Sequence, residues 1–106
     1  YKGLTLETGK AAQVIAPYEG KVAFSGPFRS YGELLIIEHN GGYHTLLAGM
    51  ARIDVAVGQW VLTGEPVAVM GYEGNQKSLL YLEIRRNSQP INPLPWLATL
   101  KGKLSG

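Results

Sequence analysis

Three side chains with chemical capacity alternate along one short stretch, residues 78–86. Tyr81, Glu83 and Arg85 are each separated by a single apolar residue. Because a strand places every second side chain on the same face, a phenol, a carboxylate and a guanidinium would meet on one surface. Such a row can form an internal ion pair between Glu83 and Arg85, or it can face a cleft and bind another molecule. The apolar residues in between predict a buried strand that runs out to a polar rim.

The sequence lacks the usual sets of catalytic side chains. It has no cysteine, so it offers neither a thiol nucleophile nor a disulfide framework. The serines at positions 25, 30, 78 and 88 have no evident histidine–aspartate setting, and the glutamates suit solvated or rim positions. His39 and His44 flank the turn Asn40–Gly42 and supply two nitrogen donors without an obvious third. This pattern favours surface histidines at a turn over a zinc site.

Length and charge restrict the class of protein. The chain has 106 residues, of which 45% are hydrophobic, which is enough for one domain with its own core. The net charge of +2 comes from basic residues scattered along the sequence. We therefore expect no nucleic-acid interface, although the mild excess favours an acidic partner. No apolar run is long enough for a transmembrane segment, and the chain begins inside an expected strand, as an excised domain would.

Turn residues divide the chain into short strands. Glycine, proline and asparagine recur about every 8–12 residues, which predicts an all-β fold, either an antiparallel sandwich or an open barrel. The best-defined hairpin joins residues 31–38 to residues 43–48 through the turn Asn40–Gly42. The unbroken apolar run at residues 34–37 predicts a central strand that is covered on both faces.

Two further features describe the organisation of the chain. Residues 14–22 and 53–71 share a pattern of strand, glycine turn and strand, which indicates an internal duplication. Near the C-terminus we expect a single helical turn whose Trp96 and Leu97 close the core. The domain is then expected to cover residues 1–98, followed by a tail over residues 99–106.

Seven short segments follow one another in an order that is informative as a set. They are Lys2-Gly3-Leu4, Val14-Ile15-Ala16-Pro17 with Gly20-Lys21-Val22, Leu35-Ile36-Ile37-Glu38-His39 with Gly42-Tyr43, Val57-Gly58-Gln59, Gly64-Glu65-Pro66, Leu82-Glu83-Ile84-Arg85 and Ile91-Asn92-Pro93. In this order they resemble the LytM or lysostaphin-type zinc metallopeptidase domain, and most closely its degenerate EnvC-like branch. The resemblance covers nearly the whole chain. It implies an antiparallel fold of the duplicated-hybrid-motif type with a central groove.

The resemblance also implies where a metal site would stand. Active members of the family hold zinc through histidine and aspartate and cut peptide cross-links in peptidoglycan. Zinc requires imidazole, thiolate or carboxylate donors. The corresponding positions in this chain are Tyr1, Thr5, Gly49, Leu79 and Tyr81. Because hydroxyl groups are poor ligands and the other side chains offer no donor, we expect no catalytic zinc, no cofactor and no peptidase activity.

A metal site that has lost its ligands leaves a groove suited to protein binding. Members of the EnvC-like branch are periplasmic activators of cell-wall amidases. The resemblance therefore implies that this chain binds an N-acetylmuramoyl-L-alanine amidase in the periplasm and promotes septal cell-wall splitting. Aromatic anchors with an arginine at the rim are typical of a binding hot spot, and a groove suits a helix from the partner. The residues expected in this partner-binding groove are Tyr1, Lys2, Thr5, Gly49, Leu79, Tyr81, Glu83 and Arg85.

Other interpretations of the same residues stay open at this point. The chain could be a module that holds peptidoglycan itself in an inactive cleft, or, less in keeping with the residues, a residual or relocated hydrolase. Tyr81 and Leu79 could serve only as core packing. Lys2 and Arg85 could be solvated charges without a contact.

Overall fold

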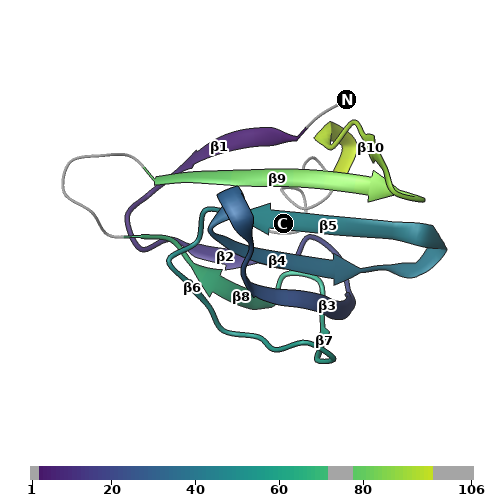
Figure 1. Cartoon of the computed structure of the whole chain (residues 1–106), viewed down its shortest axis with the longest axis horizontal. Coiled ribbons are helices and arrows are strands. Elements are labelled where there is room, and N and C mark those ends of the chain that lie inside the picture. Colours follow the sequence, from purple (N-terminus) through teal and green to yellow (C-terminus); the bar gives the residue numbers. More distant parts are fainter. Residues whose placement is uncertain (1–2, 72–77, 97–106) are drawn as a thin grey trace.

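The computed structural model describes residues 3–71 and 78–96, which form two antiparallel β-sheets and a few short helical turns (Figure 1). The strands are β1 (Leu4–Thr8), β2 (Gln13–Ile15), β3 (Gly20–Pro27), β4 (Glu33–Glu38), β5 (Tyr43–Ala48), β6 (Arg52–Ile53), β7 (Trp60–Val61), β8 (Pro66–Val69), β9 (Ser78–Arg86) and β10 (Gln89–Ile91). Two 3-10 turns, η1 (Arg29–Tyr31) and η2 (Asn40–Gly42), connect strands of the large sheet. This architecture confirms the predicted all-β antiparallel fold.

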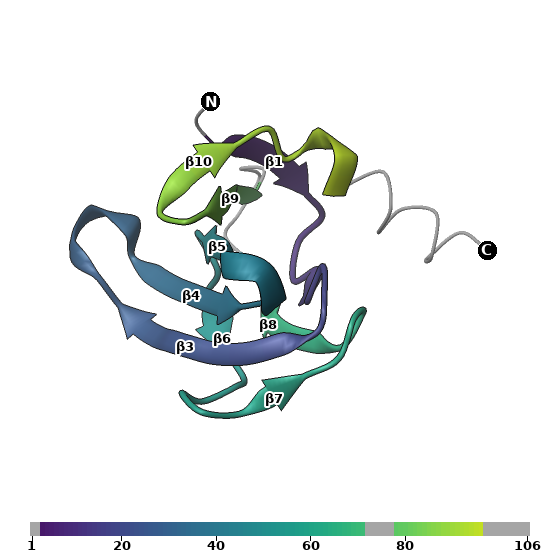
Figure 2. The same ribbon diagram turned by 90° about the vertical axis from the view of Figure 1, so that its right-hand side faces the viewer.

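The large sheet contains the strand that carries Tyr81, Glu83 and Arg85. Its strand order is β1-β9-β5-β4-β3-β7, and β10 also pairs with β9. The small sheet has the order β2-β8-β6 and lies behind the large sheet in the view of Figure 1, while η1 lies in front. Figure 2 shows β1, β9 and β10 at one side of the large sheet and β3 and β7 at the other. The long strand β9 is therefore held from both edges, by β1 and β10 on one side and by β5 on the other.

The two segments that indicated a duplication pair with each other. Strand β2 lies against β8, and β3 lies against β7. Backbone hydrogen bonds between Ala16 and residues 64–65 connect the two pairs. The similar strand–turn–strand segments therefore occupy similar positions in the two sheets.

The main core fills the space between the two sheets. On β9, the side chains of Leu80, Leu82 and Ile84 are buried there, in alternation with the polar row. Removing this apolar surface from water contributes about 25 cal/mol for each Å² that is buried. The burial of one face fixes the register of β9, because a slip of a single residue would turn Tyr81, Glu83 and Arg85 into the core.

Strand β4 is covered on both faces, as its apolar run predicted. Leu35 and Ile37 belong to the main core. Leu34 belongs to a second, smaller cluster on the opposite face of the large sheet, and Ile36 packs against that cluster together with Tyr81. The second cluster thus forms the floor on which the candidate site is built.

The C-terminal helical turn is also present. Residues 94–96 are helical, and the ring of Trp96 lies 4.5 Å from that of Tyr18 and 5.0 Å from that of Tyr43, measured between centroids. Trp96 packs against the main core, as expected. Leu97 and the tail over residues 99–106 lie outside the described residues. Within the described part of the chain, no helix has the length and apolar character needed to span a bilayer.

The prediction of a surface position for His39 is wrong. Its side chain is 8% exposed, and both ring nitrogens are hydrogen-bonded, Nδ1 to the Glu19 carbonyl oxygen and Nε2 to the Thr45 hydroxyl, each at 2.7 Å. Burial lowers the pKa of His39 below its ordinary value of 6.5, although the bond to Glu19 partly opposes this effect. His39 is therefore a neutral residue of the core, while half-buried His44 lies 3.8 Å from Glu38.

We expect the buried His39 to make stability depend on pH. Since its pKa is lower in the folded protein, the unfolded chain binds the proton more readily. Stability is therefore complete above pH 6.5, falls as the pH drops from 6.5 towards the folded pKa, and levels off below it. The slope in that window should be at most about 1.4 kcal/mol per pH unit. Urea unfolding between pH 5 and 8 measures it.

The half-buried His44 provides a control for this prediction. His44→Gln should keep most of the pH dependence, because the charge of His44 is the smallest of the three influences on the pKa of His39, and His39→Gln should remove it. An unchanged slope in the His39 variant would contradict the assignment.

Candidate functional site

Four of the predicted site residues line one groove on the outer face of the large sheet. The groove has a volume of about 430 Å³. Its walls come from β1, from β9, from the end of β5 and from the turn η1. The residues that line it are Thr5, Ser30, Tyr31, Ala48, Gly49, Leu79 and Tyr81. Thr5, Gly49, Leu79 and Tyr81 were among the residues expected to line a groove, and their role in binding stays a prediction.

Strand register brings these residues together. Tyr81 pairs with Thr5 on β1 and with Ala48 on β5, so both neighbours lie on the same face of the sheet. Leu79 is two residues before Tyr81 and is 54% exposed, which is unusual for a leucine in a central strand. Core packing therefore does not explain Leu79, and it explains Tyr81 only in part.

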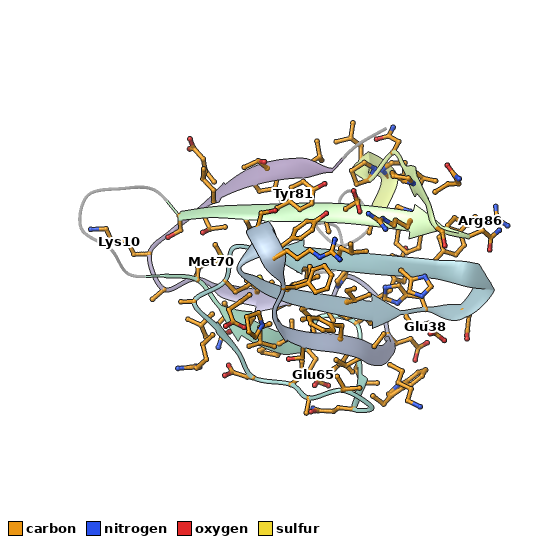
Figure 3. The ribbon with its side chains drawn as sticks, in the orientation of Figure 1. Lys10, Glu38, Glu65, Met70, Tyr81 and Arg86 are labelled. Atoms are coloured by element: carbon orange, nitrogen blue, oxygen red, sulfur yellow. The ribbon has the colours of Figure 1, made fainter. Side chains whose placement is uncertain are left out.

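The phenol of Tyr81 is held by the carboxylate of Glu83. The Tyr81 hydroxyl donates a hydrogen bond to Glu83 Oε1 at 3.0 Å. Burial raises the pKa of Tyr81, and the hydrogen bond to Glu83 raises it further, so the phenol stays protonated. Figure 3 shows Tyr81 where β1 and β9 run side by side. Its ring lies where a Cβ atom on Gly3 would stand, so the glycine immediately before β1 makes room for it.

Glu83 also fixes the guanidinium of Arg85. Arg85 Nε donates to Glu83 Oε2 at 2.6 Å, and the two side chains are 36% and 7% exposed, respectively. The ion pair that the alternation of these residues allowed is therefore present. Glu83 is too deeply buried to line the groove, and it acts by orienting the side chains of Tyr81 and Arg85.

A second, smaller hollow continues the site along β9. It has a volume of about 150 Å³ and is lined by Ile36, His44, Leu46, Arg85 and Ser88. Arg85 forms one wall of this hollow rather than of the groove around Tyr81. The outer face of β9 thus presents an apolar and aromatic half at Leu79 and Tyr81 and a cationic half at Arg85.

Sequence reasoning missed the aromatic wall that η1 provides. The ring of Tyr31 lies 6.3 Å from the ring of Tyr81, between centroids, and Phe28 lies 6.3 Å from Tyr31. Phe28 in turn contacts Phe24 at 5.5 Å. The available signal was the density of aromatic residues in the loop before Gly32. Its contact with β9 could not be inferred, because fifty positions separate Tyr31 from Tyr81 in the sequence.

The groove residues do not fit a zinc ion. Thr5 and Tyr81 offer neutral hydroxyls, while Leu79 and Gly49 offer no donor in their side chains. The carboxylate of Glu83, which contacts Tyr81, already uses both of its oxygens for Tyr81 and Arg85. Across residues 3–71 and 78–96, no three side chains of histidine, cysteine, aspartate or glutamate come close enough to hold a metal ion. Tyr1 and Lys2, the remaining predicted site residues, lie outside the described residues.

The backbone around Gly49 also opposes a larger side chain. Gly49 has a φ of +99°, and a Cβ atom at this position would collide with the carbonyl oxygen of Leu79. A histidine at position 49 would therefore require β9 to move away.

We expect Gly49→Ala to lower the free energy of unfolding by about 2 kcal/mol or more, because backbone strain of about 1–3 kcal/mol adds to the collision with Leu79. Gly58→Ala is the matched control, since Gly58 has a φ of +91° but no atom lies within 4 Å of the place that its Cβ would take. In Gly58→Ala the free energy of unfolding should fall only by the contribution of backbone strain. Equal losses in chemical denaturation of the two variants would show that the contact with Leu79 has no effect.

Known proteins resemble this chain in sequence and in fold. The model of peptidase family M23 matches residues 1–93. The chain is 35% identical over 98 residues to the murein hydrolase activator EnvC of Escherichia coli, covering 92% of the chain and 23% of that protein. It is 37% identical over 97 residues to the lipoprotein NlpD/LppB homolog of Pseudomonas aeruginosa, covering 91% of the chain and 33% of that protein. The chain thus spans about a quarter to a third of the length of these relatives.

Solved structures share the fold. A zinc containing peptidase from Vibrio cholerae has 27% sequence identity and a TM-score of 0.74, over 84% of this chain and 28% of that one. The catalytic domain of lysostaphin from Staphylococcus simulans has 21% identity and a TM-score of 0.78, over 91% of this chain and 77% of that one. The architecture of the two sheets is therefore that of peptidases, while the first of the two sequence relatives is named an activator.

Proposed function

Since the chain belongs to peptidase family M23, we propose that it keeps the scaffold of that family without the metal chemistry and acts as a non-enzymatic activator of a peptidoglycan amidase. The activator EnvC among its relatives supports a role in activating murein hydrolysis. The choice of an N-acetylmuramoyl-L-alanine amidase, the binding mode and the role in septal cell-wall splitting are part of the proposal.

One observation carries the proposal: the groove has the composition of a binding hot spot and lacks the donors of a metal site. The ring of Tyr81, the exposed Leu79 and the partly exposed Arg85 lie along one face of β9, and the turn η1 adds the ring of Tyr31. Hot spots are enriched in tyrosine and arginine, and they cluster where the partner excludes water. Thr5, Gly49 and Leu79 give the groove a wall without charge.

The shape of the site suits a helix as the binding element. The groove and the second hollow follow β9 from Leu79 to Arg85, a distance of about 20 Å at 3.3 Å per residue. An amphipathic helix of three to four turns would cover that length. Its apolar face would pack on Leu79, Tyr31 and Tyr81, and an acidic side chain at one end would reach Arg85.

We place the domain in the periplasm, where murein hydrolases act. The relative from Pseudomonas aeruginosa is named a lipoprotein, which supports a position in the cell envelope. Lys2, which is expected at the edge of the groove, belongs to this proposal as a second cation for the partner.

The proposal is tested by measuring the release of soluble fragments from purified sacculi. The chain alone should release none, the amidase alone little, and the mixture substantially more. Release by the chain alone would contradict the proposal. A pull-down of the chain with sacculi, without the amidase, tests the alternative of a peptidoglycan-binding module. Strong retention of the chain on the sacculi, together with no activation of the amidase, would favour that alternative.

A further inference from the structure

A row of side chains crosses the large sheet at right angles to β9 and meets the second, smaller hollow at Arg85. Each member is the direct register partner of the next one on five successive strands. Residues paired in this way lie on the same face of a sheet. The row, from β9 to β7, consists of Arg85, His44, Glu38, Lys21 and Trp60. We call it the cross-strand row.

The cross-strand row ends in an exposed apolar patch. Trp60 is 54% exposed, and Leu62 and Val57 beside it are 58% and 63% exposed. Val61, between Trp60 and Leu62, is fully buried. The packing of Val61 in the core therefore holds β7 in place, and Trp60 and Leu62 are not needed for this. Single exposed apolar residues are ordinary, but three within six positions that are each more than half exposed are typical of an interaction surface.

The charges along the row suit a protein surface of complementary charge. Lys21 is exposed and has no ion-pair partner among the described residues, and Glu38 meets only His44, at 3.8 Å. Figure 3 shows Glu38 at the end of β4 that is farther from Tyr81, which is the end where the row crosses. Alternating charges of this kind give register and specificity to an interface rather than a large gain in affinity.

The extent of the row matches what a stable complex needs. Five strands at a spacing of about 4.8 Å give it a length of about 19 Å. Stable interfaces bury about 800 Å² on each partner, which a single helix in the groove does not easily supply. The groove and the row together form an L-shaped surface whose corner is Arg85.

We propose that the folded body of the same amidase rests on the cross-strand row, with Trp60 as its anchor, while its helix fills the groove. This inference rests on the proposed function. The aliphatic side chains of Val57 and Leu62 beside Trp60 favour a protein over a sugar, since the buried part of a protein interface is apolar and depleted of charge. Continuity with the groove through Arg85 favours the same partner over a second one.

The test is a double-mutant cycle on the complex of the chain with the amidase, measured by calorimetric titration. Trp60→Ala should weaken binding about tenfold, as for an anchor residue worth more than 1 kcal/mol. Tyr81→Ala should weaken it by at least as much. The two losses should multiply in the double variant, because sites more than about 10 Å apart act independently. Leu94→Ala is the matched control, since Leu94 is 57% exposed but lies outside both surfaces.

The outcomes separate the two proposals. If Trp60→Ala binds like the parent while Tyr81→Ala does not, the cross-strand row does not contact the amidase and the proposed function stands. If neither variant differs from the parent, the proposed binding of the amidase in the groove fails as well, whereas the activator function would fail only if the parent chain did not stimulate the amidase. If Trp60→Ala retains full affinity for the amidase but loses retention on sacculi, the partner at Trp60 is a glycan and the inference is overturned. Lys21→Glu supplies a second readout: it should lower the association rate at low salt and have little effect at high salt.

Discussion

Tyr81→Ala and Arg85→Ala should each weaken binding of the amidase about 30-fold or more and abolish its activation at working concentrations. In the proposed complex both residues take the position of a hot spot, in which truncation costs about 2 kcal/mol or more. Tyr81 contributes a ring on the floor of the groove, and Arg85 contributes a guanidinium whose orientation Glu83 already fixes. Titration of the amidase and sacculus digestion measure the two effects.

Two further substitutions on β9 distinguish the loss of a contact with the amidase from a loss of folding. Tyr81→Phe keeps the ring and loses only the hydrogen bond to Glu83, so we expect a small effect. Arg86→Ala removes an exposed neighbouring arginine that lies over the Tyr43 ring, 5.1 Å from its centroid, on the other face of β9, so activation should persist. If Arg86→Ala is as damaging as Arg85→Ala, the loss reflects general charge and not the groove.

The second large effect is expected at Glu83, which touches no partner in the proposed complex. Glu83→Ala leaves the buried end of Arg85 and the Tyr81 hydroxyl without their acceptor, and removal of one member of a buried ion pair costs about 3–5 kcal/mol. Because Arg85 is 36% exposed and recovers water, we expect a smaller loss of about 2–3 kcal/mol. Affinity should fall about tenfold even where the variant is folded, since both anchors lose their orientation.

Glu83→Gln distinguishes the effect of the hydrogen bond from Tyr81 from the effect of the ion pair with Arg85. The amide oxygen can still accept from Tyr81, but the attraction to Arg85 is lost, so the variant should fall between the parent and Glu83→Ala in both stability and affinity. Chemical denaturation gives the first quantity and titration with the amidase gives the second. Full affinity in a folded Glu83→Ala would show that neither anchor needs to be positioned.

The features that local pattern determines were predictable. The alternation of Leu80, Leu82 and Ile84 with the polar row placed Tyr81, Glu83 and Arg85 on one face of β9. The apolar run of β4 indicated a strand that is covered twice, and the turn at Asn40–Gly42 defined the central hairpin. In each case the sequence pattern lies within a few residues of the structural feature that it predicts.

The features that were missed depend on distant partners. His39 becomes a core residue because the Glu19 carbonyl and the Thr45 hydroxyl satisfy both of its nitrogens, and no local pattern reports such partners. Tyr31 reaches the groove only because η1 folds over the sheet. The crowding of Gly49 by the Leu79 carbonyl exists only after β5 and β9 have paired.

The metal content of the purified chain tests most directly whether the groove has lost the capacity to bind zinc. The chain should be equilibrated with zinc, freed of unbound metal by dialysis and analysed by elemental mass spectrometry. Because Thr5 and Tyr81 offer only neutral hydroxyls, and Gly49 and Leu79 offer no side-chain donor, we expect far less than one zinc ion per chain. One tightly held zinc ion per chain, lost on replacement of Thr5 or Tyr81, would contradict the proposed loss of metal chemistry.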